Sequence, residues 1–240
     1  MKLWNGFECE DFIFDGKNAK IIYPGCETPQ KTLILKTEYF NAFPEAEIEL
    51  LKLGYYLCFV ENGSRWGYES DIDRKADFIG FVANKLGTQA KCVPVGMSCG
   101  GLIAVRFAAK YPHLVSCLYL DAPVMNYMSY PCGFGISKRC DDDFPEIFEV
   151  LGLSGMSELI SYRKMPADMI PVLAENKIPV ILVSGDSDTI VPYCENGILL
   201  EKYYSERSLP VEVHIKKGGD HHPHCLDDPK PIVDFILKFA

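Results

Sequence analysis

Residues 217–226, KGGDHHPHCL, bring three histidines and a cysteine together within five positions: His221, His222, His224 and Cys225. Imidazole and thiol groups at this density suit three roles. They can bind a metal ion, they can supply the base that activates a nucleophile, or they can belong to a polar loop with no chemical role. The stretch alone does not decide between these roles, so the decision depends on the other reactive residues of the chain.

A second reactive stretch, VPVGMSCGG, contains G-x-S-x-G at residues 96–100, between an apolar strand-like run and a helical pattern. A sharp turn from strand to helix gives the central residue a positive φ and raises its side chain above the sheet, where flanking glycines avoid clashes. Ser98 would then lie at a helix N-terminus, whose free N–H groups favour developing negative charge. This context favours a nucleophilic Ser98 over a helix-capping serine.

Cys99 is the rival nucleophile in the same turn. It follows the apex by one residue, so that its backbone N–H, and not its thiol, would face a substrate. We therefore expect Ser98 to supply the nucleophilic oxygen and Cys99 to supply an N–H group.

A nucleophilic serine needs a base, and the base needs an acid that orients it. After a serine of this kind, the acid and then the histidine follow along the chain. In VSGDSDTIVP, Asp188 lies clear of the strand end and is the favoured acid, whereas Asp186 suits a turn-capping role. Asp121, at the end of SCLYLDAP, is the alternative acid. The histidine must then come from the loop after the last strand, which is the histidine cluster.

The elements that must position these residues alternate along the chain. FECEDFIF and AKIIYP read as two opening strands joined by the turn DGKN. We then expect strands at 31–36, 55–61, 91–97, 116–123, 178–186 and 210–217. We expect helices at 44–54, 72–86, 98–112, 167–176, 193–206 and 228–239. Apolar strands between helices predict a mostly parallel sheet covered on both faces, with function at the carboxyl ends of the strands.

A chain of 240 residues without an internal repeat or low-complexity linker suits a single domain, residues 1–240. The pattern loosens at residues 124–166, where two short helical pieces stand in an irregular stretch. We expect this stretch to be a small cap-like insertion within the domain.

Composition excludes several classes of function. The net charge of −9 gives no basic footprint for nucleic acid or an anionic membrane. No run reaches the ~18–20 apolar residues that cross a bilayer, and the N-terminal stretch lacks a signal-peptide pattern. The ten cysteines are scattered singly without a CxxC pair, which is typical of a reduced, cytoplasmic protein. The sequence leaves the oligomeric state open, with a homodimer among the options.

Together, the turn GMSCGG, the acid loop GDSDTIVP and the histidine loop GGDHHPH resemble the α/β-hydrolase superfamily in type and order. The further stretches LKTEYFNAFPE, LDAPVMN and GGDHHPHCLDDPKPIVDFI are similar to a bacterial branch of esterase-like serine hydrolases. The resemblance covers nearly the whole chain. It implies an α/β-hydrolase fold with an eight-stranded central sheet and serine-dependent hydrolysis of carboxylic esters without a cofactor.

Carried onto this sequence, the resemblance implies Ser98 as the nucleophile, Asp188 as the acid and His221 as the base. Asp220 stands where the superfamily often has glycine, so His222 remains an alternative base. The resemblance also implies an oxyanion hole after the strand at 31–36. Its N–H groups would come from Glu38 and Cys99, because only backbone donors are needed there.

A zinc site built from His222 and His224, with Cys225, Asp227 or Asp228, is the competing interpretation of the cluster. We expect no metal, because no second histidine or cysteine group stands at another strand end. We expect the mouth of the site to be lined by Tyr39, Phe40, Arg65 and Trp66, with Phe43, Tyr127, Tyr130 and Phe134 around them. An aromatic mouth with an arginine suits a small neutral ester, such as an acylated carbohydrate.

The expected activity is therefore that of a carboxylesterase-type serine hydrolase acting on a small-molecule ester. Two alternatives stay open. A serine peptidase could use the same three residues, and a hydrolase-fold binding protein could carry an inactive site.

Overall fold

The structure is a computed structural model that describes residues 2–26 and 32–240. In these residues, one nine-stranded sheet runs in the order β1-β2-β3-β5-β4-β6-β7-β8-β9. The strands are β1 (Lys2–Trp4), β2 (Phe7–Phe14), β3 (Lys17–Ile22), β4 (Leu33–Lys36), β5 (Tyr56–Val60), β6 (Cys92–Met97), β7 (Leu118–Asp121), β8 (Val180–Gly185) and β9 (Val211–Lys216).

Strands β4 to β9 are parallel to one another, and β3, β2 and β1 extend the sheet beyond β5 with antiparallel pairing. The sequence predicted eight strands, whereas the described residues form nine. The additional strand, β1, is three residues long and lies at the sheet edge, which is too short for an alternating pattern to reveal. Lys31, the expected first residue of one strand, lies outside the described residues.

The chain direction across the sheet reverses at β4. From β4 the chain passes through α1 to β5 on one side and then returns through α2 to β6 on the other side. Ligands of open α/β sheets bind at such a reversal, beyond the carboxyl ends of the strands. The loops that follow β4 and β6 contain Glu38 and Ser98.

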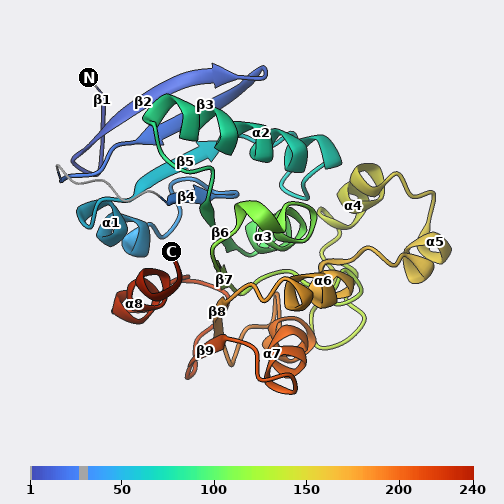
Figure 1. The fold of residues 1–240 in the computed structure, drawn as a ribbon. Coiled ribbons are helices and arrows are strands. Elements are labelled where there is room, and N and C mark those ends of the chain that lie inside the picture. Colours follow the sequence, from blue (N-terminus) through green and yellow to red (C-terminus); the bar gives the residue numbers. More distant parts are fainter. Residues whose placement is uncertain (1, 27–31) are drawn as a thin grey trace.

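Helices cover both faces of the sheet (Figure 1). Helices α1 (Glu45–Lys52) and α8 (Lys230–Phe239) pack on one face, around Leu50 and Ile236. The other face carries α2 (Glu69–Leu86), α3 (Cys99–Lys110), α6 (Ile170–Glu175) and α7 (Gly197–Ser205). This double cover explains why the central strands are continuous apolar runs, since both of their faces are buried.

The stretch 124–166 contains two short helices, α4 (Phe144–Leu151) and α5 (Met156–Ser161), as the sequence predicted. Figure 1 shows both helices to one side of the sheet, beyond the ends of α2 and α3. None of the helices in the described part of the chain combines the length and apolar content that a membrane crossing requires.

Candidate active site

Ser98 occupies the sharp turn between β6 and α3, with φ 52° and ψ −119°. A positive φ is costly for a residue with a side chain and persists only where the surroundings hold it. Here the Ser98 N–H donates to the Asp121 carbonyl at 2.9 Å, and the Ser98 carbonyl accepts from Val124 at 3.1 Å. Backbone hydrogen bonds to the end of β7 and to the loop after it therefore fix the turn, and the positive φ of Ser98 is the one that the G-x-S-x-G context predicted.

Two glycines let strand and helix approach each other at this turn. A Cβ atom on Gly96 would lie 2.4 Å from the Gly100 carbonyl oxygen, and one on Gly101 would lie 2.7 Å from Pro123 Cα, which belongs to the segment after β7. Backbone atoms cannot move out of the way as a flexible side chain can. Glycine at these two positions is thus a requirement of the close approach.

Gly96→Ala should lower the free energy of unfolding by at least about 1–3 kcal/mol, because the new methyl group overpacks rigid backbone. Gly80→Ala in the middle of α2 is the matched control. Apart from the adjoining backbone of α2, no heavy atom of the described residues lies within 4 Å of a Cβ at this position, so alanine should instead stabilise the protein by about 0.5–1 kcal/mol. Urea denaturation of both variants measures the difference, and equal stability of the two would contradict the packing argument.

A chain of hydrogen bonds joins three of the residues singled out from the sequence. His221 Nε2 lies 3.1 Å from Ser98 Oγ, and His221 Nδ1 lies 2.8 Å from Asp188 Oδ2. His221 and Asp188 are buried. The residues come from the ends of β6, β8 and β9, so the parallel sheet itself brings them together. Serine, imidazole and carboxylate in this arrangement can activate the serine oxygen.

The Asp188 carboxylate is stabilised as an anion. Burial raises the pKa of Asp188, but the hydrogen bond to His221 and those from the N–H groups of Val191 and Ile190, each at 2.8 Å, outweigh burial and lower this pKa below its usual value. An ionised Asp188 favours the His221 tautomer whose proton is on Nδ1, which leaves Nε2 free to accept a proton from Ser98.

A second aspartate–histidine pair lies beside the first. Asp121, the alternative acid, does not contact His221. Its Oδ1 lies 2.8 Å from His224 Nδ1, and its Oδ2 accepts from the N–H of Cys225 at 2.7 Å and from the Tyr119 hydroxyl at 3.1 Å. Asp121 and His224 are both buried. Asp121 therefore ties the histidine loop to the end of β7.

Asp121→Asn should lower the free energy of unfolding by about 1–3 kcal/mol. An amide cannot accept all three hydrogen bonds, so a buried donor is left unpaired. Asp227→Asn, at an exposed position of the same loop, should change stability by less than about 0.5 kcal/mol. Thermal or urea unfolding distinguishes them, and an unaffected Asp121→Asn variant would show that the pair does not anchor the loop.

Asp186 also holds the histidine loop. Its Oδ1 accepts from the Gly218 N–H at 2.7 Å, across from β8 to the end of β9. The sequence predicted a turn-capping role for Asp186. Its Oδ1 accepts from the Ser187 hydroxyl in the same loop at 3.1 Å, in addition to the N–H in the histidine loop. Asp186 and Asp121 thus fix the two ends of the segment that contains His221.

The loop after β4 lies against the first turn of α3. The Thr37 hydroxyl lies 2.7 Å from the Gly100 carbonyl oxygen and 3.0 Å from that of Val95. A Cβ on Gly100 would lie 3.5 Å from the Glu38 backbone nitrogen. The N–H of Glu38 therefore stands close to the helix N-terminus that begins at Cys99, where N–H groups have no partner within the helix. Glu38 and Cys99 are the residues whose N–H groups the sequence analysis named as oxyanion donors, and that role stays a prediction.

The Glu38 carboxylate turns to Asn62, whose Nδ2 donates to Glu38 Oε2 and also to the Thr37 carbonyl, at 2.8 Å. Lys36, buried at the end of β4, donates to the Ala42 carbonyl at 3.0 Å and pairs with Glu47. The loop is thus held from both ends by polar side chains. The negative charge of Glu38 is directed toward an amide donor.

Burial raises the pKa of the Cys99 thiol to about 12. A thiol with this pKa is protonated near neutral pH and is a poor nucleophile. Cys99 therefore differs from Ser98, whose oxygen has an imidazole partner.

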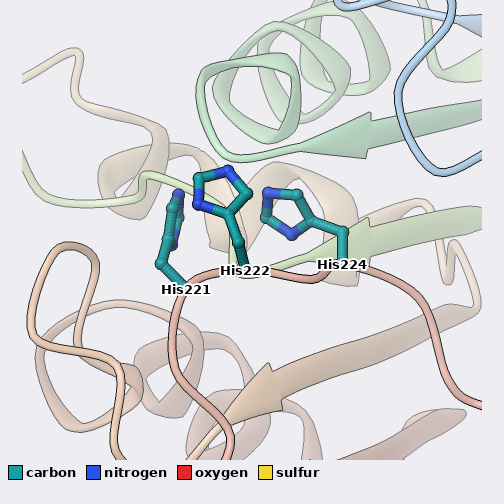
Figure 2. Close-up of side chains that lie close together, drawn as sticks. All are labelled: His221, His222 and His224. Atoms are coloured by element: carbon teal, nitrogen blue, oxygen red, sulfur yellow. The ribbon is translucent and has the colours of Figure 1, made fainter.

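A pocket of ≈ 330 Å³ opens above Ser98 and His221. Its other lining residues are Tyr39, Ala42, Phe43, Arg65, Cys99, Tyr130, Ile190, His222 and His224. Figure 2 shows the three histidine rings side by side on the loop between β9 and α8. Tyr39 and Arg65 were expected here, whereas Ile190 and Ala42 carried no signal in the sequence.

Phe40 and Trp66, expected to line the mouth, are not among the described residues that line this pocket. Phe40 is buried against Trp4 and Phe59, with ring centroids 5.2 Å from each. Trp66 is buried against Tyr127 and Tyr130, and its Nε1 donates to Glu146 at 2.8 Å. Both side chains turn into the interior, where burial of a large aromatic surface is favourable. Tyr127 is likewise buried, and Phe134 is exposed.

Arg65 connects the pocket wall to residues of the stretch 124–166. Its guanidinium pairs with Asp143, and its Nε donates to Glu146 Oε2 at 3.0 Å. Asp143 is buried and also accepts from the Tyr130 hydroxyl. Two carboxylates therefore balance the positive charge of Arg65. The stretch 124–166 meets the pocket wall through this set of contacts.

Comparison with known proteins gives structural matches only. No family model matches the sequence, and no curated protein matches it either. A truncated carbohydrate esterase from gut microbiota is similar, with a TM-score of 0.69, 17% identity, and coverage of 92% of this chain and 90% of that one. Est1E from Butyrivibrio proteoclasticus gives a TM-score of 0.66 and 16% identity over 96% of this chain and 98% of its own.

The acylaminoacyl peptidase of Pyrococcus horikoshii gives a TM-score of 0.68 with 16% identity over 92% of this chain. The present chain spans 40% of the length of that peptidase. At these identities the matches establish the architecture and not the reaction. Taken with the mostly parallel sheet and its flanking helices, they show that this chain has the α/β-hydrolase fold.

Proposed function

We propose that the chain is a serine hydrolase that cleaves small carboxylic esters through an acyl-enzyme. The observation that carries the proposal is the hydrogen-bonded series Ser98 Oγ, His221 and Asp188, at 3.1 and 2.8 Å, beneath an open pocket. Ser98 is the proposed nucleophile, His221 the base and Asp188 the acid.

In the proposed reaction, Ser98 Oγ attacks the ester carbonyl carbon while His221 Nε2 takes the serine proton. The N–H groups of Cys99 and Glu38 stabilise the oxyanion. His221 then gives its proton to the leaving alcohol, and the acyl group remains on Ser98. Water, activated by the same imidazole, attacks the acyl-enzyme and releases the carboxylic acid. Asp188 stabilises the imidazolium at each stage.

The size and chemistry of the pocket support a small neutral substrate. A volume of ≈ 330 Å³ is at the lower end of ligand pockets, which span about 300–1,000 Å³. The aromatic rings of Tyr39, Phe43 and Tyr130 offer apolar surface for an acyl group. Because the carboxylates of Asp143 and Glu146 already offset the positive charge of Arg65, this residue should attract an anionic substrate only weakly. An acylated carbohydrate is one ester of this kind.

A peptidase with the same residues is the second candidate, since structural matches include peptidases as well as esterases. The pocket is the ground on which we place the esterase first, because its small volume and aromatic lining suit a short acyl group.

Two measurements test the proposal. A fluorophosphonate probe should label Ser98, and the labelled residue is identified by peptide mass spectrometry. A panel of p-nitrophenyl esters, acetylated and feruloylated sugars and aminoacyl p-nitroanilides should show faster cleavage of short-chain esters than of long-chain esters or amides. Faster cleavage of the anilides would favour the peptidase, and absence of both labelling and turnover would favour a binding protein.

A further inference from the structure

Three imidazoles of one loop converge in the pocket wall. The ring centroids of His221, His222 and His224 lie 4.7 to 5.0 Å apart, and the rings are nearly perpendicular in pairs (Figure 2). One ring nitrogen from each residue lies within 4.8 Å of the other two. The proposed reaction uses only His221, so it accounts for one of the three rings.

Buried carboxylates orient two of these rings in the same manner. His221 Nδ1 is bonded to Asp188, and His224 Nδ1 is bonded to Asp121, each at 2.8 Å. Because a carboxylate accepts, each Nδ1 carries the proton and each Nε2 keeps its lone pair. Imidazoles that bind metal ions are oriented by carboxylates in this way, which fixes the tautomer and raises the basicity of the ligating nitrogen.

His222 differs from the other two, because its ring is exposed and stacks on Phe43 with centroids 5.9 Å apart. Tetrahedral zinc with Zn–N bonds of about 2.0–2.1 Å would hold nitrogens about 3.4 Å from one another. The three nitrogens must therefore approach by a little over 1 Å at most. Rotation of the exposed His222 side chain can shorten its distances to the other two nitrogens, and a small movement of the loop that contains His221 and His224 has to shorten the third.

We propose that His221, His222 and His224 form a binding site for Zn²⁺ or a similar transition-metal ion. Three neutral imidazole nitrogens suit such ions and not Mg²⁺ or Ca²⁺, which prefer oxygen ligands. Because all three histidines line the pocket, water from the pocket would complete the coordination of such an ion. The set differs from the one considered from the sequence, since neither Cys225 nor the aspartates at 227 and 228 belong to it among the described residues.

Occupation of this site has a consequence that rests on the proposed function. A metal ion on His221 Nε2 takes the lone pair that would accept the Ser98 proton. Bound metal and ester hydrolysis then exclude each other, so zinc acts as a reversible inhibitor. Removal of the metal with EDTA raises activity, which is the opposite of what a catalytic metal would give.

The direct test is cobalt binding to the full chain, followed by visible absorption. Wild-type protein should bind one equivalent of Co²⁺ with the bands of a tetrahedral site and without the near-ultraviolet band of thiolate ligation. His222→Gln should weaken binding at least tenfold, and since His222 is exposed, the substitution removes little buried contact. His113→Gln and His214→Gln, outside the cluster, are the matched controls and should bind as wild type does.

Unchanged cobalt affinity in His222→Gln, or a spectrum with thiolate ligation, would overturn the site. Zinc inhibition is measured separately with p-nitrophenyl acetate. The zinc concentration for half inhibition should rise at least tenfold in His222→Gln. Cobalt binding without any ester turnover would leave the metal site intact and refute the proposed function. Turnover that is insensitive to a metal bound at the cluster would refute the exclusion between metal and hydrolysis.

Discussion

Ser98→Ala should lower kcat for ester hydrolysis by about 10⁴-fold or more, with the fold unchanged. Without Oγ no acyl-enzyme forms, and only substrate binding and the oxyanion donors remain to accelerate the reaction. The hydroxyl takes little part in the fold, because the turn is held by backbone hydrogen bonds to Asp121 and Val124. Initial rates with p-nitrophenyl acetate and fluorophosphonate labelling give the two readouts.

Two variants control this experiment. Ser205→Ala removes an exposed hydroxyl at the end of α7 and should keep both the rate and the labelling. Cys99→Ala removes the buried thiol but keeps the backbone N–H, so its kcat should stay within about tenfold of wild type. Rates near the wild-type value in Ser98→Ala, or a loss in Cys99→Ala as large as that expected for Ser98, would refute Ser98 as the nucleophile.

Asp188→Asn should lower kcat by about 10⁴-fold, because an amide favours the wrong imidazole tautomer and does not stabilise the imidazolium. Asp121→Asn is an unusually close comparison. Both carboxylates are buried, both lie 2.8 Å from a histidine Nδ1, and both histidines belong to the same loop. Only Asp188 is connected through its histidine to Ser98. The folded Asp121→Asn protein should therefore keep kcat within about tenfold of wild type.

The comparison is made on samples that circular dichroism and gel filtration show to be folded, since Asp121→Asn is expected to lose stability. A greater loss of kcat in Asp121→Asn than in Asp188→Asn would reverse the assignment. The base would then be His224, with Asp121 as its acid.

Much of the fold follows from short-range patterns. Apolar runs between helical stretches predicted the central strands, and the glycines around Ser98 predicted the turn between β6 and α3. The reason is physical, since a strand buried on both faces has to be apolar and a close strand–helix contact excludes a Cβ atom. Element ends differ by a few residues, as where the helix expected at 193–206 begins as α7 at Gly197.

The partners of polar side chains were less accessible to prediction. Asp121 and Asp188 were both recognised as strand-end acids, and three histidines as candidate partners. Which aspartate is hydrogen-bonded to which histidine depends on the path of the loop after β9 over the ends of β7 and β8. The spacing of residues along the chain does not predict that path. Asp121 with His224 and Asp188 with His221 are separated by 103 and 33 residues.

The aromatic residues of loops were the least predictable. Phe40 and Trp66 stand beside Tyr39 and Arg65, which do line the pocket, and loops have no periodicity that separates inward from outward positions. The burial of Trp66 depends on Glu146, a residue of the insertion that accepts its N–H. A contact across 80 residues of chain leaves no local sequence signal.

Asp143 accepts a hydrogen bond from Tyr130 and pairs with Arg65. These contacts have a consequence for the rate constant of substrate association. Tyr130 and Arg65 both line the pocket, and both side chains contact the buried Asp143 carboxylate. These contacts fix two sides of the pocket relative to each other, so we expect an opening that keeps its shape when a ligand enters. Association with such a site is set by diffusion and by the shedding of pocket water, so its rate constant should vary with solvent viscosity more than with the slow loop motions that gate lidded enzymes.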